Sequence, residues 1–300
     1  MNQIEQNQTI ILKEFLTPND CEDIKKLQEV CFADDPVNLK LELDYKLSVP
    51  KHTEKGLKKI TEFLYYADGV LVSYLGICVF GGNVPELNGM THPEWRRRGL
   101  FTKLFSLALS ELKWDNPEKL LLLTDERSES GKAFIQHISG LYSFSEYRMK
   151  YYAHTISELP SYVHPAIQLK TVEKSDIKEI SRQNAIYFGT TEESEILAMD
   201  ESMLTDGMYL VRLKDSTIGK IYVEYGENSA FIYGFGILPE FRRNGYGKAA
   251  FQAVMDIIKS KGIDDIQLDV ESKNRNALNL YKAFGFQEMS VMNYFEYNIS

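Results

Sequence analysis

The residues whose types and spacing point to chemistry lie in a turn rich in arginine and glycine. In FIYGFGILPEFRRNGYGKAAF, a proline ends an apolar strand, and Gly245 and Gly247 let the chain turn directly into a helix. Such a turn directs several backbone N–H groups and the positive end of the helix toward one point. With the charges of Arg242, Arg243 and Lys248 nearby, this arrangement could bind a diphosphate.

The turn occurs twice in the chain. PEWRRRGLF carries Arg96 and Gly99, and PEFRRNGYG carries Arg242 and Gly245, 146 positions further along (242 − 96 and 245 − 99). This period is about half of the 300 residues, which indicates duplicated domains rather than a solenoid of short repeats.

Each half has the same order of expected elements. An apolar strand precedes an amphipathic helix, and a hairpin, the repeated turn, a second helix and an apolar strand follow. The order strand, turn, helix, strand implies a right-handed crossover between parallel strands. The segment HTISELPSYVHPA has two prolines and little periodicity, so we expect domains at residues 1–155 and 166–300. The expected helices are 19–32, 99–112, 174–188 and 245–262; the expected strands are 8–15, 71–80, 86–92, 120–126, 167–172, 218–226, 230–238 and 263–270.

Composition and charge exclude several classes of protein. Apolar residues make up 44% and charged residues 26% of the chain, as in ordinary soluble globular proteins, and no window is long and apolar enough for a bilayer span. We therefore expect a cytoplasmic protein. The net charge of −9 disfavours a nucleic-acid partner and favours a cationic substrate. Three cysteines without CxxC spacing and five scattered histidines indicate neither a disulfide framework nor a metal site.

The pattern around the second turn resembles the GNAT family of N-acetyltransferases. A strand, a proline and an aromatic residue precede Arg-x-x-Gly-x-Gly, and a helix with its own signature follows downstream. The resemblance covers most of residues 166–300 and, in weaker form, residues 8–150, so the whole chain resembles a tandem GNAT protein. The residues that carry it are Pro239, Phe241, Arg242, Gly245, Gly247, Asn274, Ala277, Leu280, Tyr281, Gly285 and Phe286.

The resemblance implies an α/β fold (an α+β mixed sheet) in each domain, with the central sheet flanked by helices and splayed between its fourth and fifth strands. Acetyl-CoA would lie in that gap as co-substrate, with no metal. Its diphosphate would rest on the N–H groups of residues 243–248, and its pantetheine would pair with the backbone from Phe235 to Ile237. The implied coenzyme-binding residues are Phe235, Ile237, Arg242, Arg243, Asn244, Gly245, Tyr246, Gly247, Lys248 and Asn274.

Transfer of an acetyl group from a thioester to an amine requires a neutral amine, stabilisation of an oxyanion and a proton for the thiolate. From the residues alone, core packing is the favoured explanation of Tyr281. The resemblance reverses this preference and implies that Tyr281 is the general acid. Asp269 is the candidate base, with Glu271 and Glu224 as substitutes; the alternative for Asp269 is a hydrogen-bonded strand carboxylate. Asn274 is either a helix cap or a pantetheine ligand. Residues 151–300 contain no cysteine, which leaves direct transfer in a ternary complex.

The first half lacks part of this pattern. Aligning Gly140 with Gly285 places Gln136 opposite Tyr281, so no phenol stands at the position of the acid. Residues 96–99 keep the arginines and the glycine of the turn. We therefore expect a degenerate domain that is structural or regulatory. Two other tyrosines of this half, Tyr142 and Tyr147, remain candidates for a different route.

The acceptor is an amine whose identity the sequence leaves open. TTEESEILAMDES, around residues 190–202, is acidic and could attract a polyamine, an aminoglycoside or a basic peptide, although such runs are commonly solvated faces. We expect a monomer or homodimer without nucleic-acid or membrane partners. A non-catalytic module that binds or senses acetyl-CoA or another acyl-CoA is the main alternative. An aminoacyl transferase that uses charged tRNA is a third, but the basic insertions it would need are absent.

Overall fold

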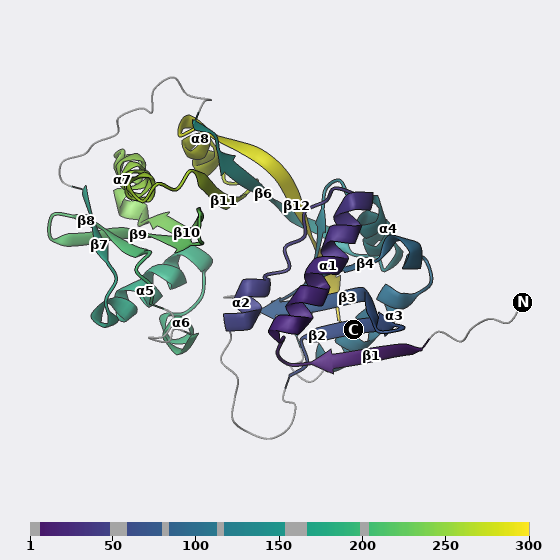
Figure 1. Cartoon of the computed structure of the whole chain (residues 1–300). Helices are drawn as coiled ribbons and strands as arrows, with labels where there is room; N and C mark the ends of the chain where they lie inside the picture. The colour runs from purple at the N-terminus through teal and green to yellow at the C-terminus, as the bar shows by residue number, and fades with distance from the viewer. Residues whose placement is uncertain are drawn as a thin grey trace, which may run out of the picture. The chain divides into compact units, whose positions relative to one another are not determined.

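The computed structural model describes residues 7–48, 59–79, 84–112, 117–153, 167–198 and 204–299. The expected boundary segment 154–166 lies outside them. Contacts within the chain divide it into two compact units (Figure 1). Unit 1 comprises Met1–Phe144 and Met292–Ser300, and unit 2 comprises Ser145–Val291.

Unit 1 is a mixed sheet with helices on both faces. Its strand order is β1-β2-β3-β4-β5-β12, where β12 is Phe286–Asn298. Strands β4 and β5 are parallel, and the other neighbours are antiparallel. Its elements are β1 (Gln8–Lys13), α1 (Pro18–Asp34), α2 (Leu43–Ser48), β2 (Glu62–Ala67), β3 (Val70–Val79), β4 (Pro85–Thr91), η1 (Pro93–Trp95), α3 (Leu100–Leu112), β5 (Lys119–Asp125) and α4 (Glu129–His137).

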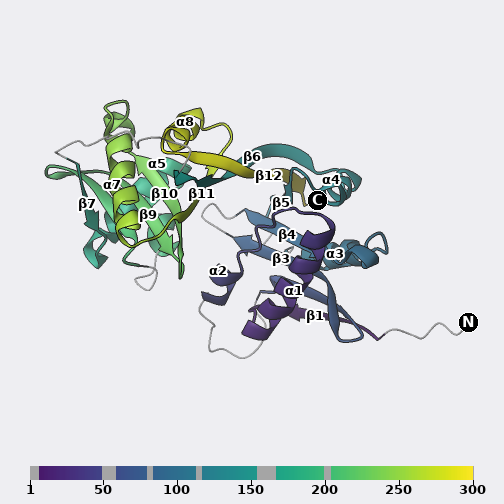
Figure 2. The same ribbon diagram turned by 45° about the horizontal axis from the view of Figure 1, so that its top comes forward.

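Unit 1 has two hydrophobic cores, one on each face of its sheet, and alternate residues of its strands contribute to each. On β2, Phe63 and Tyr65 pack with the apolar faces of α3 and α4, whereas Leu64 between them packs with α1. Neighbouring residues of a strand point to opposite faces of the sheet, so one strand supplies both cores. Figure 2 shows α1 lying across the strands of this unit.

Unit 2 repeats the arrangement. Its strand order is β7-β8-β9-β10-β11-β6, with β10 and β11 parallel. Its elements are β7 (Ile167–Thr171), η3 (Lys174–Asp176), α5 (Ile177–Phe188), α6 (Glu192–Ala198), β8 (Met208–Leu213), β9 (Ser216–Tyr225), β10 (Ser229–Ile237), η5 (Pro239–Phe241), α7 (Tyr246–Ser260), β11 (Asp265–Glu271) and α8 (Arg275–Ala283), joined by β6 (Leu141–Tyr151) and followed by β12 (Phe286–Asn298).

Two helices cover opposite faces of the unit 2 sheet (Figure 1). Phe251, Val254 and Ile258 recur at helical spacing on α7 and are fully buried against the strands. On the other face, Ile180 of α5 packs with Tyr222 of β9. This arrangement confirms the α/β class with a mixed sheet flanked by helices, and the strands on either side of each expected crossover are parallel.

The last strand of each half is exchanged. Residues 146–150 of β6, from the first half of the sequence, pair with β11 inside unit 2. Residues 292–298 of β12, from the second half, pair with β5 inside unit 1. The compact units therefore differ from a simple division at residues 155 and 166, because each sheet is completed by a strand from the other half.

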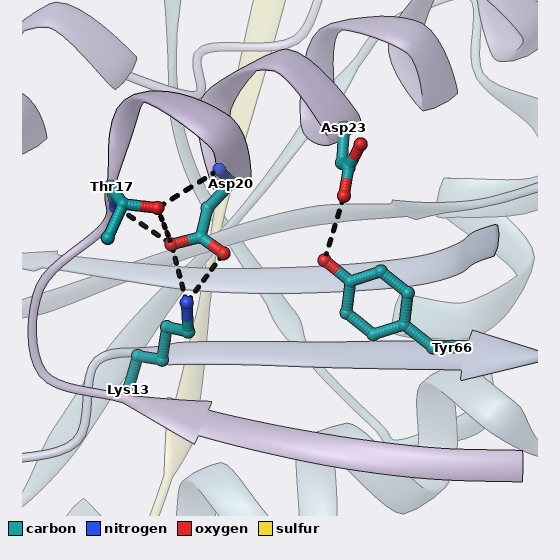
Figure 3. Close-up of polar contacts among 5 residues, drawn as sticks. All are labelled: Lys13, Thr17, Asp20, Asp23 and Tyr66. Carbon is teal, nitrogen blue, oxygen red and sulfur yellow. Dashed lines mark hydrogen bonds and ion pairs between the residues drawn. The ribbon is translucent and has the colours of Figure 1, made fainter. Parts of the chain in front are cut away.

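In both units the first helix begins at a capping box that a lysine of the preceding strand contacts. In unit 1, Thr17 and Asp20 form a capping box at α1, and Lys13 of β1 donates to both carboxylate oxygens of Asp20 at 2.6 Å (Figure 3). Figure 3 also shows Tyr66 of β2 donating to Asp23 one turn later. The capping box satisfies backbone N–H groups that have no partner within the helix. Unit 2 repeats the box at η3, where Lys170 contacts Asp176 at 2.9 Å.

No helix in the described part of the chain is long and apolar enough to span a membrane.

Candidate active site

The turn between β10 and α7 contains two left-handed residues. Arg243 has φ 66° and Gly245 has φ 80°, and α7 begins at Tyr246. A residue with a side chain in this region costs roughly 1–2 kcal/mol, and such strain is commonly found at functional turns. The Nε of Arg242 donates to the carbonyl of Ile237 at 2.8 Å and so ties the turn to the end of β10.

Several backbone N–H groups of this turn have no acceptor in the part of the protein that the structure describes. The Arg242 N–H donates to the Pro239 carbonyl at 3.2 Å and is already used. Among the described residues, no acceptor contacts the N–H groups of Asn244, Gly245 or Gly247. These groups surround the positive end of the 15-residue helix α7 and can bind an anion there.

The remaining residues expected to bind the coenzyme lie on the same turn or on the strand before it. Phe235 packs on Phe251 with ring centroids 5.8 Å apart, so its backbone, not its side chain, is available to a ligand. Tyr246 is half-buried against the core, and Lys248 is exposed on the first turn of α7. The turn therefore brings most of the expected residues together within one short segment.

Unit 1 contains the same turn in the same conformation. Arg97 has φ 61° and Gly99 has φ 80°, close to the values at Arg243 and Gly245. The Nε of Arg96 donates to the carbonyl of Thr91 at 3.1 Å, as the corresponding arginine does in unit 2. The spacing of 146 residues seen in the sequence is therefore preserved in the backbone.

Next to each turn, two parallel strands separate. In unit 2 the pairing of β10 with β11 ends at Ile232 and Leu268, after which β10 pairs only with β9 and β11 only with β6. In unit 1 the pairing of β4 with β5 ends at Leu87 and Leu122. Each sheet therefore opens beside its turn, between the fourth and fifth strands of the unit, as the resemblance implied.

In unit 1 the opening is a cavity of about 620 Å³. It is lined by β4, β5, α3 and α4 and reaches the turn at Arg97 and Gly99. Phe101, which stands at the position of Gly247, lines this cavity and packs edge-on against Phe134 at 4.9 Å. A cavity of this size is within the range that holds small molecules and cofactors.

Tyr281 lies on α8 with its ring in the core of unit 2. Its side chain is 7% exposed and packs against Phe251 and Phe286, with ring centroids 5.2 and 6.2 Å away. Burial raises the pKa of its hydroxyl well above the ordinary value, so it remains protonated at neutral pH. No hydrogen-bond partner of this hydroxyl is found in the described part of the chain, which leaves its proton available for donation.

The helix that carries Tyr281 begins at a side-chain cap. Asn274 accepts a hydrogen bond from the Ala277 N–H at 3.1 Å, which is the capping alternative raised from the sequence. In unit 1, Ser128 caps α4 in the same way by accepting from the Gly131 N–H at 3.1 Å. These two caps are again 146 residues apart.

The alignment of the two halves at this helix needs a correction of one residue. The left-handed residue after the helix is Gly285 in unit 2 (φ 89°) and Ser139 in unit 1 (φ 62°), not Gly140. Ile135, and not Gln136, therefore stands opposite Tyr281. Ile135 is likewise buried, and it has no proton to donate. The absence of a phenol at this position is unchanged by the correction.

Asp269 is held in an ion pair. Both of its carboxylate oxygens accept from Arg148 of β6, from Nε at 2.5 Å and from a terminal nitrogen at 2.9 Å. The planar guanidinium matches the two carboxylate oxygens and holds the side chain of Asp269 against β6. Glu271 and Glu224, the named substitutes, are both exposed. The contacts thus favour the alternative for Asp269, a hydrogen-bonded strand carboxylate.

Sequence reasoning missed Lys220, which lies opposite the bulge in β10. The register of β9 and β10 shifts between Tyr233 and Gly236, and Lys220 is the β9 partner of Gly236. Its side chain is buried, and its ammonium donates to the amide oxygen of Asn184 on α5. The glycines in β10 were a usable signal, because they indicated a close approach in this strand. A Cβ at Gly236 would lie 2.6 Å from the ring of Tyr187, also on α5.

Part of the acidic segment forms α6. Glu195 is buried and accepts a hydrogen bond from Thr190 at 2.7 Å, so this carboxylate belongs to the structure of unit 2. Glu193 on the same helix is exposed. Asp200 and Glu201 lie outside the described residues.

Comparison with known proteins agrees with this geometry. Residues 175–286, which contain the β10 turn, the opening and Tyr281, match the model of the acetyltransferase (GNAT) family. These residues form a GNAT domain. The match includes unit 2 from α5 through the end of α8 and leaves out β6 and β7.

Curated relatives match part of this domain. An uncharacterized N-acetyltransferase, YycN of Bacillus subtilis, is 39% identical over 69 residues, which are 23% of this chain and 44% of that protein. The ribosomal protein bS18-alanine N-acetyltransferase of Escherichia coli K12 is 28% identical over 64 residues, 21% of this chain and 43% of that protein. The chain thus spans less than half the length of these curated relatives. Their names support an acyltransferase.

Solved structures extend the likeness to both halves. A GCN5-related N-acetyltransferase from Sphaerobacter thermophilus has a TM-score of 0.75 at 17% identity, covering 97% of this chain and 96% of its own. A tandem GNAT protein from the clavulanic acid biosynthesis pathway has a TM-score of 0.66 at 13% identity, covering 98% and 99%. The GNAT domain is therefore the second of two copies of one fold. Among the described residues, no group of histidine, cysteine or acidic side chains could hold a metal ion.

Proposed function

We propose that the protein is an N-acetyltransferase that moves an acetyl group from acetyl-CoA to a primary amine of a small molecule or peptide. The observation that carries the proposal is the turn before α7. The N–H groups of Asn244, Gly245 and Gly247 have no acceptor among the described residues. The turn stands beside the opening between β10 and β11 and lies within the GNAT domain. A diphosphate is the anion that several converging N–H groups at a helix start bind well.

The shape of the turn fits the coenzyme. A Cβ built on Gly245 would meet no atom within 4 Å, and one on Gly247 would meet only side-chain atoms at 3.7 and 3.8 Å. The space in front of these two residues is therefore open to a ligand. We assign the diphosphate to the N–H groups of residues 243–248, and the pantetheine to the edge of β10 from Phe235 to Ile237 that β11 leaves free.

Tyr281 is the proposed general acid. Its hydroxyl is protonated at neutral pH and has no partner among the described residues, so it can give a proton to the departing thiolate. The residues from 151 to 300 include no cysteine to carry an acetyl group. The nitrogen of the acceptor therefore attacks the thioester carbon directly, and the C–S bond breaks after the N–C bond has formed.

We propose a class of acceptor, the cationic primary amines. The acidic chain and the exposed Glu193 of α6 favour a cationic amine. The bS18-alanine enzyme acts on a protein, and a fungal protein whose fold matches with a TM-score of 0.71 contains a glucosamine N-acetyltransferase region. An alanine-first peptide, glucosamine and 1,4-diaminobutane are therefore suitable test acceptors.

A second candidate function applies to unit 1, namely binding of acetyl-CoA or another acyl-CoA without turnover. The cavity of about 620 Å³ and the conserved backbone of its turn support binding. The isoleucine opposite Tyr281 argues against proton donation there. Unit 1 would then sense the coenzyme or stabilise the enzyme, while unit 2 performs the transfer.

A matched pair of variants separates the two sites. Gly245→Asp and Gly99→Asp each place a negative charge on one turn, and aspartate tolerates the left-handed backbone better than most residues. Gly245→Asn and Gly99→Asn are the uncharged controls. Titration of coenzyme A by calorimetry should show weaker binding for the Asp variant of each unit that holds the coenzyme. Unchanged binding in both Asp variants would refute the anion site.

Activity is measured as free thiol released from acetyl-CoA with each of the three amines. Tyr281→Phe should lower kcat by a factor of about 10² to 10⁴, the usual contribution of a general acid. An unchanged rate would remove Tyr281 from the mechanism. Binding of coenzyme A without thiol release for any amine would favour the sensing function for the whole protein.

A further inference from the structure

Lys220 is a buried cation whose surroundings are mostly aromatic. Its side chain is 1% exposed. The ammonium donates to Asn184 and lies 4.8 Å from the centre of the Tyr222 ring and 5.8 Å from that of Tyr187. No carboxylate forms an ion pair with it in the described part of unit 2. Buried lysines are normally paired, so this one lacks the usual structural explanation.

Unit 1 has a fully hydrogen-bonded polar group at the position that corresponds to Lys220. Tyr74 of β3 is the residue of unit 1 that corresponds to Lys220. Tyr74 pairs with Met90 of β4, as Lys220 pairs with Gly236 of β10. Its hydroxyl donates to Glu62 at 2.5 Å, and Glu62 also accepts from Lys46 of α2 at 2.5 Å. The buried charges of unit 1 are thus neutralised within one hydrogen-bonded group. Unit 2 leaves its buried charge without such a partner.

The position of Lys220 connects it with the opening. Its strand partner Gly236 lies beyond the last pair between β10 and β11, on the stretch of β10 to which the thioester end of the coenzyme is assigned. The rings of Tyr187 and Tyr222 lie directly against Gly236 and Gly234, on the α5 side of this stretch. Lys220 lies between these rings, next to the place where an acceptor must approach.

Groups on α5, α6 and β9 act on the charge of Lys220. Burial lowers the pKa of its ammonium to about 8, while the buried carboxylate of Glu195 on α6 favours the charged form. Asn184 and Tyr187 face it from α5, and Tyr222 faces it from its own strand. An appreciable fraction of the side chain is therefore neutral near physiological pH, which is the condition for a proton acceptor.

We propose that Lys220 accepts the proton that the acceptor ammonium must lose before it attacks the thioester. This inference rests on the proposed acetyl transfer. The proton passes from the acceptor ammonium to the Lys220 nitrogen, and the free amine forms the N–C bond with the acetyl carbon. The C–S electron pair leaves with sulfur, which takes its proton from Tyr281. The nitrogen of the new amide gives up its second proton, which restores the hydroxyl of Tyr281. Lys220 then returns its proton to solvent.

The assignment also resolves the position of the base. Asp269 is held by two hydrogen bonds from Arg148, and its neighbours on the core face of β11 are apolar. Lys220 lies on β9, on the other side of β10 from Asp269, and reaches the reacting region from there. The two strands that flank β10 would then divide the work, with Asp269 fixing β6 to β11 and Lys220 handling the proton.

The test compares Lys220→Arg and Lys220→Met with Tyr74→Phe, the matched control at the same position in unit 1. Arginine keeps the positive charge but does not lose its proton at neutral pH. We expect kcat for thiol release with 1,4-diaminobutane, glucosamine or the alanine-first peptide to fall at least about 100-fold in both Lys220 variants and to remain unchanged in Tyr74→Phe. In the wild type, kcat/KM should rise with pH through about 8 and then level off.

A direct titration makes the inference independent of the assay. In protein labelled with ¹⁵N at the lysine side chains, one resonance should titrate near pH 8 and be missing in Lys220→Arg. Full activity of folded Lys220→Arg, or a Lys220 resonance that titrates above pH 10, would overturn the inference while leaving acetyl transfer intact. If wild-type protein releases no thiol with any of the amines, the proposed function falls and this role falls with it.

Discussion

The unpaired charge of Lys220 predicts that its removal stabilises the protein. The difference between its ordinary pKa of 10.5 and the value of about 8 in the folded protein corresponds to about 3 kcal/mol against the protonated side chain. Lys220→Met removes this cost and keeps an unbranched apolar stem in the same space. The hydrogen bond to Asn184 is lost, which offsets about 1 kcal/mol. We therefore expect a net gain of about 2 kcal/mol at pH 7.

The effect of Lys220 on the free energy of unfolding depends on pH. Because the folded-state pKa of Lys220 is depressed, the unfolded chain binds more protons between about pH 8 and pH 10.5. The stability of the wild type should therefore rise with pH across this window, relative to a chain without the lysine. The advantage of Lys220→Met is full below pH 8 and disappears above pH 10.5.

Urea unfolding can assign the change to unit 2. The two tryptophans of the sequence, Trp95 and Trp114, both fall in the residue range of unit 1, so fluorescence reports that unit, whereas far-ultraviolet circular dichroism reports both units. Lys220→Met should move the circular dichroism transition of unit 2 to higher urea and leave the fluorescence transition in place. Tyr74→Phe should do the opposite and destabilise unit 1 by about 1–3 kcal/mol, because Glu62 loses a buried donor.

The combination of outcomes is what tests the reasoning. A residue kept for function at a cost in stability should give a variant that is more stable and less active. A lower unfolding midpoint for Lys220→Met at pH 7 would refute the claim that this charge is unpaired. A gain that is the same at pH 7 and pH 10.5 would show that protonation is not its cause.

Three further predictions concern single side chains. Tyr281→Phe should leave the melting temperature within about 2 °C of the wild type, because its hydroxyl has no partner to lose among the described residues, while kcat falls. Gly245→Ala should lower the free energy of unfolding by about 1 kcal/mol, measured in urea, because the residue has φ 80°. Burial alone would raise the pKa of Asp20, but hydrogen bonds from Lys13 and Thr17 outweigh it and lower this pKa. The ionised carboxylate therefore stabilises the protein, and this contribution is lost as pH falls below about 4. Melting curves of Asp20→Asn should lack this part of the acid dependence.

Local signals in the sequence were enough to predict most of the scaffold. The two turns, the helices after them and the strands before them follow from proline, glycine and hydrophobic spacing, and each lies where it was expected. The left-handed residues at Gly99 and Gly245 explain why glycine recurs at this spacing. Such features depend on a few neighbouring residues, so they are visible in the chain itself.

Features that depend on distant partners were not visible. Asp269 appeared available as a base because Arg148, its partner, is 121 positions away on β6. The exchange of β6 and β12 was equally hidden. Neither segment was among the expected strands, and the side-chain pattern of a strand does not show which sheet it joins. Lys220 stands within an otherwise apolar run, and only the packing of α5 over β9 shows that its charge is buried without an ion pair.

The duplication itself supplies the strongest argument about function, because it offers an internal comparison. The two units share their backbone down to the φ angles of the turns, so a difference between equivalent side chains reflects a difference in role rather than in fold. At one such pair, unit 1 places a tyrosine in a neutralised polar group and unit 2 places a lysine among aromatic rings. At another, unit 1 has an isoleucine where unit 2 has a tyrosine whose proton is free. Both differences put the titratable groups beside the opening of unit 2, which is where a reaction that moves two protons would need them.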